Sequence, residues 1–173
     1  GVEQFIASWF TLELTSFYHL LDDLVVGRED RFAFYSGPPP TGPFDTDPYA
    51  NDGNGRTFGL ELLGTISAKN TSGFIAATLS RSDRVTRPGD ERILFAYDQP
   101  LVVNALVSRK LPKRWRLGAR IRYGSGNPYT PVNNRVYNHD RREFIPVYGE
   151  RDSARLPPFF SLDVRIDKDY VFK

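Results

Sequence analysis

Residues suited to catalysis or metal binding are few in this 173-residue sequence, and they stand apart. His19 and His139 have no spaced partner, and the absence of cysteine excludes disulfides and thiolate metal sites. The acidic segment 45–55 offers oxygen ligands, yet it lacks the sixth-position glycine and the twelfth-position acidic residue of an EF-hand calcium loop. We therefore expect no enzymatic activity, no bound metal and no cofactor.

Aromatic and cationic residues in two long segments rich in Pro, Gly, Asp and Asn are better candidates for contact with a small ligand. In segment 27–55 the candidates are Arg28, Arg31, Phe34 and Tyr35, and in segment 127–157 they are Tyr129, Arg135, Tyr137 and Tyr148. Loops of this length are uncommon in compact domains unless they serve a function. For each residue taken singly, packing within its own loop is the simpler expectation.

A strict alternation of residue types marks the segment RWRLGARIRYGSG (114–126). Successive side chains of a strand point to opposite faces, so the alternation predicts a strand with one apolar face and one cationic face. The apolar face carries Trp115, Leu117, Ala119, Ile121 and Tyr123, and the cationic face carries Arg114, Arg116, Arg120 and Arg122.

The same period of two recurs along most of the chain and predicts an all-β, antiparallel fold of about six or seven strands. Strands are expected over 10–20, 57–66, 73–82, 101–108, 114–125 and 160–167, and residues 1–7 are expected to end a further strand. Short connections (69–72 and 111–113) alternate with long ones (27–55, 83–97 and 127–157). All the long loops should therefore lie at one end of the sheet, and no domain boundary is expected within residues 1–173.

Alternation alone suits a soluble β-sandwich as well as a transmembrane β-barrel. The barrel is favoured because strand 114–125 is longer than soluble strands, which have about 5–6 residues, and matches the roughly 9–11 needed to span a bilayer. Trp115 and Tyr123 are about 26 Å apart along the strand, which a tilt near 45° reduces to about 19 Å along the membrane normal, so they lie near the two edges of an apolar band of about 25 Å whose edges are lined with aromatic residues. Short turns at one end and long loops at the other are typical of outer-membrane barrels.

In such a barrel the face of Trp115, Leu117, Ala119, Ile121 and Tyr123 meets lipid, and the opposite face lines the interior. The interior-facing set comprises Glu13, Glu61, Arg116, Arg120, Arg122, Asp163 and Arg165. Glu13, Glu61, Asp163 and Asp167 are expected to offset the charge of the arginines.

Six short stretches follow one another along the chain: LDDLVVG (21–27), NGRTFGLELL (54–63), ATLSRS (77–82), YDQP (97–100), WRLGARIRYGSGNPYTP (115–131) and RLPPFFSLDVRIDK (155–168). In this order they resemble the C-terminal barrel region of TonB-dependent outer-membrane receptors. The resemblance implies a barrel of about 22 strands with a plug inside, and active uptake of a scarce ligand such as a ferric siderophore or another metal chelate. It also implies, as partners, outer-membrane lipid and the TonB energy-coupling complex, which acts through the N-terminal plug.

The resemblance places the chain in the cell outer membrane of a Gram-negative bacterium. Its strand count is too low for the whole barrel and no plug or TonB box is evident, so we expect residues 1–173 to be one part of a longer protein. The net charge of +2 gives no indication of nucleic-acid binding. A passive porin, a soluble β-sandwich binding module and a complete eight-stranded barrel are the alternatives.

Overall fold

The computed structural model describes residues 1–27, 49–86 and 89–170, and it is all-β with antiparallel pairing throughout. Seven strands follow one another across the main sheet: β1 (Val2–Ala7), β2 (Phe10–Gly27), β3 (Tyr49–Ala68), β4 (Thr71–Val85), β6 (Leu101–Leu111), β7 (Trp115–Gly124) and β12 (Phe159–Lys168). The short strand β5 (Ile93–Leu94) pairs with the end of β4. The predicted all-β, antiparallel fold class is thus confirmed, and the seven long strands of the main sheet correspond to those expected, but the short strands β5 and β8–β11 were not predicted. The described residues form an open sheet and no closed barrel.

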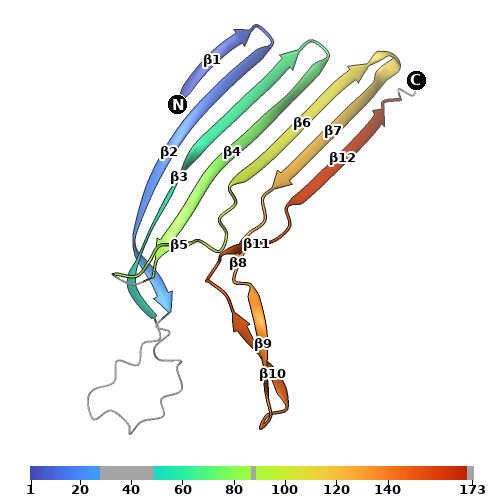
Figure 1. Cartoon of the computed structure of the whole chain (residues 1–173). Helices are drawn as coiled ribbons and strands as arrows, with labels where there is room; N and C mark the ends of the chain where they lie inside the picture. The colour runs from blue at the N-terminus through green and yellow to red at the C-terminus, as the bar shows by residue number, and fades with distance from the viewer. Residues whose placement is uncertain (28–48, 87–88, 171–173) are drawn as a thin grey trace.

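Short and long connections lie at opposite ends of the sheet, as the sequence predicts (Figure 1). Tight turns join β1 to β2, β3 to β4 and β6 to β7 at what we call the turn end. The β6–β7 turn contains a short 3₁₀ segment (Pro112–Arg114) in which Lys113 and Arg114 both have positive φ angles. The connections from β4 to β6 and from β7 to β12 lie at the other end, the loop end, where β2 also ends and β3 begins.

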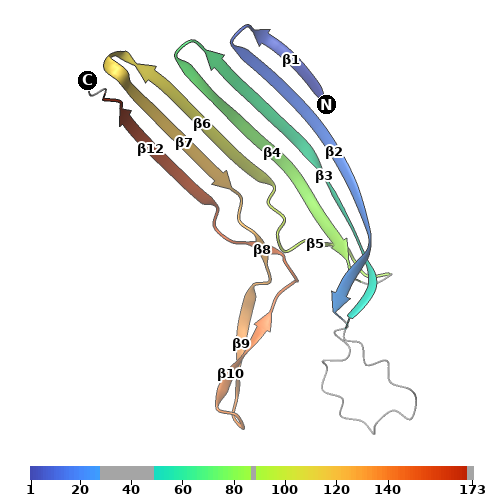
Figure 2. The ribbon, with the colours of Figure 1, turned by 180° about the vertical axis from the view of Figure 1, so that it is seen from behind.

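Two expectations about the loop end need correction. The strands β2, β3 and β4 run beyond their predicted limits, and β3 begins at Tyr49 inside the segment predicted as a loop. The connection 127–157 is also not irregular throughout. It contains the hairpin of β9 (Val132–Asn138) and β10 (Glu143–Tyr148), and at its base β8 (Pro128–Tyr129) pairs with β11 (Ala154–Arg155). The β9–β10 hairpin projects past the loop end of the sheet (Figure 2).

The main sheet is a single layer with almost no apolar core. Among the described residues, Ala50 and Val85 are the buried hydrophobic residues, while most large apolar side chains are exposed. The outermost strands β1 and β12 each pair with one neighbour, β2 and β7 respectively. The described sheet therefore leaves unpaired backbone groups along both of its outer edges, which natural proteins normally cover or pair.

Candidate functional site

The register places the alternating apolar positions of the six strands β2, β3, β4, β6, β7 and β12 on one face of the sheet, whereas on β1 Phe5 points to the other face. Residues directly opposite each other in antiparallel strands point to the same side. One such row crosses six strands and consists of Phe10, Ile66, Gly73, Val107, Ala119 and Val164. A parallel row consists of Leu14, Leu62, Ala77, Val103, Tyr123 and Phe160. We call this side the Trp115 face and the other side the Arg120 face.

The Trp115 face is a continuous apolar surface that nothing in the described chain covers. Its side chains are substantially exposed on every strand of the main sheet from β2 to β12, with Val164 63 % exposed and Leu79 56 %. Soluble monomers rarely expose apolar patches larger than a few hundred Å². An exposed apolar face of this extent requires a nonpolar environment or a covering partner.

Aromatic residues bound this apolar surface at both ends, eight residues apart on two separate strands. On β7 the pair is Trp115 and Tyr123, and on β2 it is Phe10 and Tyr18. Tyr18 also stacks on Phe58 of β3, with ring centroids 6.1 Å apart.

The two aromatic pairs are displaced from each other along the strands by the same amount at each end. At the turn end, Phe10 shares a row with Ala119, which lies four residues beyond Trp115 on β7. At the loop end, the residue of β2 that shares a row with Tyr123 is Leu14, and Tyr18 lies four residues beyond Leu14. Four strand-to-strand steps separate β2 from β7. The aromatic bands therefore shift by about one residue per strand, which corresponds to an angle of about 35° at ~3.3 Å per residue and ~4.8 Å between strands.

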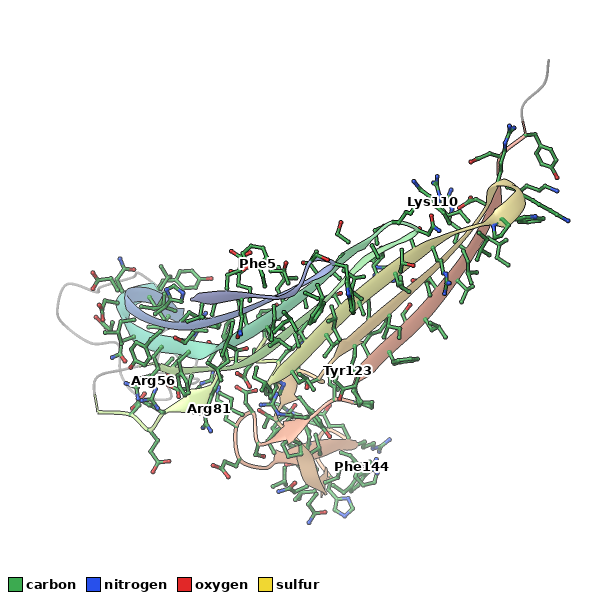
Figure 3. The ribbon with its side chains drawn as sticks, turned by 90° about the horizontal axis from the view of Figure 1, so that it is seen from above. Phe5, Arg56, Arg81, Lys110, Tyr123 and Phe144 are labelled. Atoms are coloured by element: carbon green, nitrogen blue, oxygen red, sulfur yellow. The ribbon has the colours of Figure 1, made fainter. Side chains whose placement is uncertain are left out.

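The Arg120 face carries most of the charged residues of the sheet. Figure 3 shows Lys110 and Phe5 on this side and Arg81, Arg56 and Tyr123 on the other. The charges gather on β7 and β12, where Arg120 lies opposite Asp163 and Arg116 lies opposite Asp167. A groove of about 540 Å³ runs along this charged stretch beside Gly118.

The carboxylates expected to offset the arginines fall into two groups. Asp163 lies 3.8 Å from an Arg122 guanidinium nitrogen, and Asp167 accepts a 2.9 Å hydrogen bond from Arg165, so the two aspartates lie among the cations. Glu13 and Glu61 share the Arg120 face but lie on β2 and β3, opposite Leu63 and Thr15. These two glutamates therefore do not contact the arginines of β7 within the described sheet, and their role in offsetting the charge of the interior stays a prediction.

The structure brings three of the ligand-contact candidates together. Arg135 and Tyr137 of β9 and Tyr148 of β10 lie on one face of the hairpin, since Tyr137 pairs with Phe144 and Arg135 with Pro146. The Tyr137 and Phe144 rings are 5.1 Å apart and both are exposed. Tyr129 lies apart from them in β8. Arg28, Arg31, Phe34 and Tyr35 lie outside the described residues.

A cavity of about 240 Å³, which sequence reasoning missed, lies at the loop end between the end of β2 and the second and third long connections. It is lined by the end of β2 (Leu24–Gly27), by Arg84 and Phe95, and by Arg151 and Asp152 of the third connection. The Arg84 guanidinium carbon lies 3.4 Å from the Phe95 ring centroid, a cation–π contact. The cavity offers cations, a carboxylate and an aromatic ring to a small polar ligand.

Asp98 joins β4 to the third long connection through hydrogen bonds between residues distant in sequence. Its side chain, 1 % exposed, accepts hydrogen bonds from the Ser82 backbone at 2.6 Å and from Arg155 at 2.6 Å. Arg155 also donates to the carbonyl oxygens of Asp98 and Gly126, and Ser125 exchanges hydrogen bonds with the backbone of Leu101. These hydrogen bonds bring together residues of the stretches ATLSRS, YDQP, YGSG and RLPP, which are distinctive in the sequence. We call this set of contacts around Asp98 the clamp.

A second buried carboxylate, Asp83, lies on the Trp115 face just beyond the apolar surface at the loop end. It is 2 % exposed and accepts hydrogen bonds from Arg56 at 3.0 Å and from Arg92 at 2.9 Å, while Arg81 lies 3.8 Å away. Burial raises the pKa of Asp83, but the hydrogen bonds from Arg56 and Arg92 outweigh it and hold that pKa below its usual value. We call Arg56, Arg81, Asp83 and Arg92 the arginine cluster.

The described residues contain no group of three or more His, Asp or Glu side chains arranged to hold a metal ion. Their structure also includes no helix with the length and apolar character needed to cross a membrane. Comparison of the chain with protein-family models, with curated proteins and with solved structures gives no match.

Proposed function

We propose that this chain is the barrel portion of a TonB-dependent outer-membrane receptor that takes up a scarce ligand such as a ferric siderophore. The observation that carries the membrane assignment is the Trp115 face with its displaced aromatic pairs. Transmembrane strands tilt by about 35–45°, and a tilted strand must shift its aromatic positions from one strand to the next to keep them at a constant depth. The shift of about one residue per strand matches that requirement.

The dimensions of the apolar surface agree with the same proposal. Eight residues span about 26 Å along a strand, which a tilt of about 35° reduces to about 22 Å along the membrane normal, close to an apolar band of about 25 Å. A soluble sandwich is less well supported, because its apolar face would pack against a second sheet. The described chain forms one layer.

The receptor assignment, as opposed to any other outer-membrane barrel, rests on the resemblance of the six stretches. The loop-end cavity and the hairpin face with Arg135, Tyr137 and Tyr148 support it, because both place aromatic rings and cations where an incoming ligand arrives. A passive porin would use the same lipid-facing surface, so the two differ in the lumen.

Extraction of membranes with alkaline carbonate tests the membrane assignment. The full-length protein should stay in the membrane pellet and should migrate faster on gels when unheated, as a folded barrel does. Recovery of the protein in the soluble periplasmic fraction would refute the proposal.

Conductance across planar bilayers then separates the receptor from the porin. A receptor with an occupied lumen should show no steady open channel, and a porin should show one.

A further inference from the structure

We propose that the arginine cluster binds the phosphate headgroup of an anionic lipid whose acyl chains lie on the adjoining Trp115 face. This inference rests on the proposed membrane location but is separate from any uptake function. It assigns a lipid site to the leaflet at the loop end.

The position of the cluster agrees with the depth of a lipid headgroup. Because the aromatic bands shift by about one residue per strand, the loop-end boundary of the apolar surface crosses β3 near Gly59 and β4 near Leu79. Arg56 and Arg81 therefore lie three and two residues beyond it, about 8 and 5 Å along the membrane normal at a tilt of about 35°. The headgroup layer occupies about 5–8 Å on each side of the hydrocarbon core, so these two arginines and the phosphates lie at the same level.

The charge of the cluster calls for a further anion. Three arginines surround one carboxylate, which leaves a net charge of +2 at this spot. Each guanidinium has five N–H donors, and the two oxygens of Asp83 take only a few of them. Arg81 makes no hydrogen bond to Asp83, and its side chain is 61 % exposed. A phosphate group, with several acceptor oxygens, fits such a convergent set of donors.

The buried carboxylate gives the site a fixed geometry. Asp83 accepts hydrogen bonds from two arginines of different elements, so it holds β3, β4 and the segment before β5 together. The Arg56 guanidinium also lies 5.7 Å from the Phe58 ring centroid. The arginines are therefore held close together despite their mutual repulsion, with their free donors beside an apolar surface. A phosphate joined to acyl chains matches both features, whereas a free phosphate matches only the first.

Native mass spectrometry of the full-length protein in bilayer nanodiscs tests the site. The nanodiscs contain phosphatidylcholine with a minority of phosphatidic acid, whose phosphate is exposed. The wild-type protein should retain phosphatidic acid in preference to phosphatidylcholine. The double variant Arg81→Gln, Arg92→Gln should weaken this preference by about tenfold or more, because it removes two cations next to an anionic headgroup.

A matched control removes the same charge from the same face at the turn end. Arg109 lies opposite Leu117 and Lys168 opposite Trp115, so Arg109→Gln, Lys168→Gln should leave the preference unchanged. An equal loss in both double variants would show general charge attraction and would overturn the site. Displacement of the lipid by inorganic phosphate alone would also overturn it, in favour of a soluble anion.

Carbonate extraction tests the membrane assignment independently of the lipid preference. Wild-type protein that resists carbonate extraction but shows no preference for phosphatidic acid refutes the lipid site and leaves the proposed function standing. Wild-type protein that does not enter membranes refutes both.

Discussion

Arg155 reaches across 57 residues of sequence to Asp98, where its Nη2 atom lies 2.6 Å from a carboxylate oxygen that is almost fully buried. The same carboxylate accepts the Ser82 backbone N–H. The pair therefore joins the end of β4, the approach to β6 and the base of the third long connection. The loop end owes its shape to this contact more than to any apolar core, since the described chain has very few buried hydrophobic residues.

Replacing Asp98 with Asn should lower the free energy of unfolding by about 1–3 kcal/mol, because charge-assisted hydrogen bonds are lost in a buried setting. Denaturant titration of the full-length protein in detergent measures the change. Asp163→Asn is the matched control, because Asp163 is exposed and lies 3.8 Å from Arg122. It should change stability by less than about 0.5 kcal/mol. Equal effects of the two substitutions would contradict the clamp.

Gly126→Ala should disrupt the base of the third connection. A Cβ atom at this position would overlap the backbone carbonyl oxygen of Leu156, which a small side-chain adjustment cannot relieve. We expect a loss of about 1–3 kcal/mol, typical of overpacking, and faster proteolysis within residues 127–157. Gly124→Ala is the control, since its nearest neighbours are Gln99 side-chain atoms at 3.8 Å. Unchanged proteolysis of the Gly126 variant would contradict the close approach of the Gly126 backbone to the Leu156 carbonyl oxygen.

Substitutions along β7 should show a dependence on membrane depth. Ala119 lies midway between the two aromatic residues of β7, so Ala119→Arg should destabilise the barrel by about 2–4 kcal/mol. Trp115→Arg, at the edge of the apolar surface, should cost about 0–1 kcal/mol for the charge, plus some lost ring packing. Unfolding titrations in lipid measure both. In a soluble sandwich both positions would be core, and the two losses would be similarly severe.

Residues 1–173 expressed alone should not form a closed, conducting barrel. The described sheet has unpaired outer edges on β1 and β12, and each unsatisfied backbone group in lipid costs several kcal/mol. Analytical ultracentrifugation in detergent should reveal oligomers or aggregates. A monomeric fragment that conducts ions would instead support the alternative of a complete small barrel.

The alternation of residue types predicted the sheet well because a period of two is a local signal. It located β7 within one residue at each end, and it placed Trp115 and Arg120 on opposite faces. It failed for the β9–β10 hairpin, where the strands are short and interrupted by Pro146 and by asparagines. Such strands are hard to distinguish from a loop by pattern alone.

The charged clusters were missed for a different reason. Asp83 begins the segment 83–97 that was predicted as a loop and Asp98 directly follows it, and their partners Arg56 and Arg155 are 27 and 57 residues away in sequence. Contacts of this kind depend on strand register, which alternation does not define. The displacement between the aromatic pairs of β2 and β7 became visible for the same reason only once the rows across the sheet were known.

The most direct test of the lipid-facing assignment is a spin-label scan of β7 in the membrane-inserted protein. The described sequence contains no cysteine, so single cysteines can be introduced at positions 116–122 and labelled. We predict high collision rates with oxygen at 117, 119 and 121, and low ones at the even positions, which should instead respond to water-soluble nickel reagents. The reverse pattern, or equal accessibility at odd and even positions, would contradict the account.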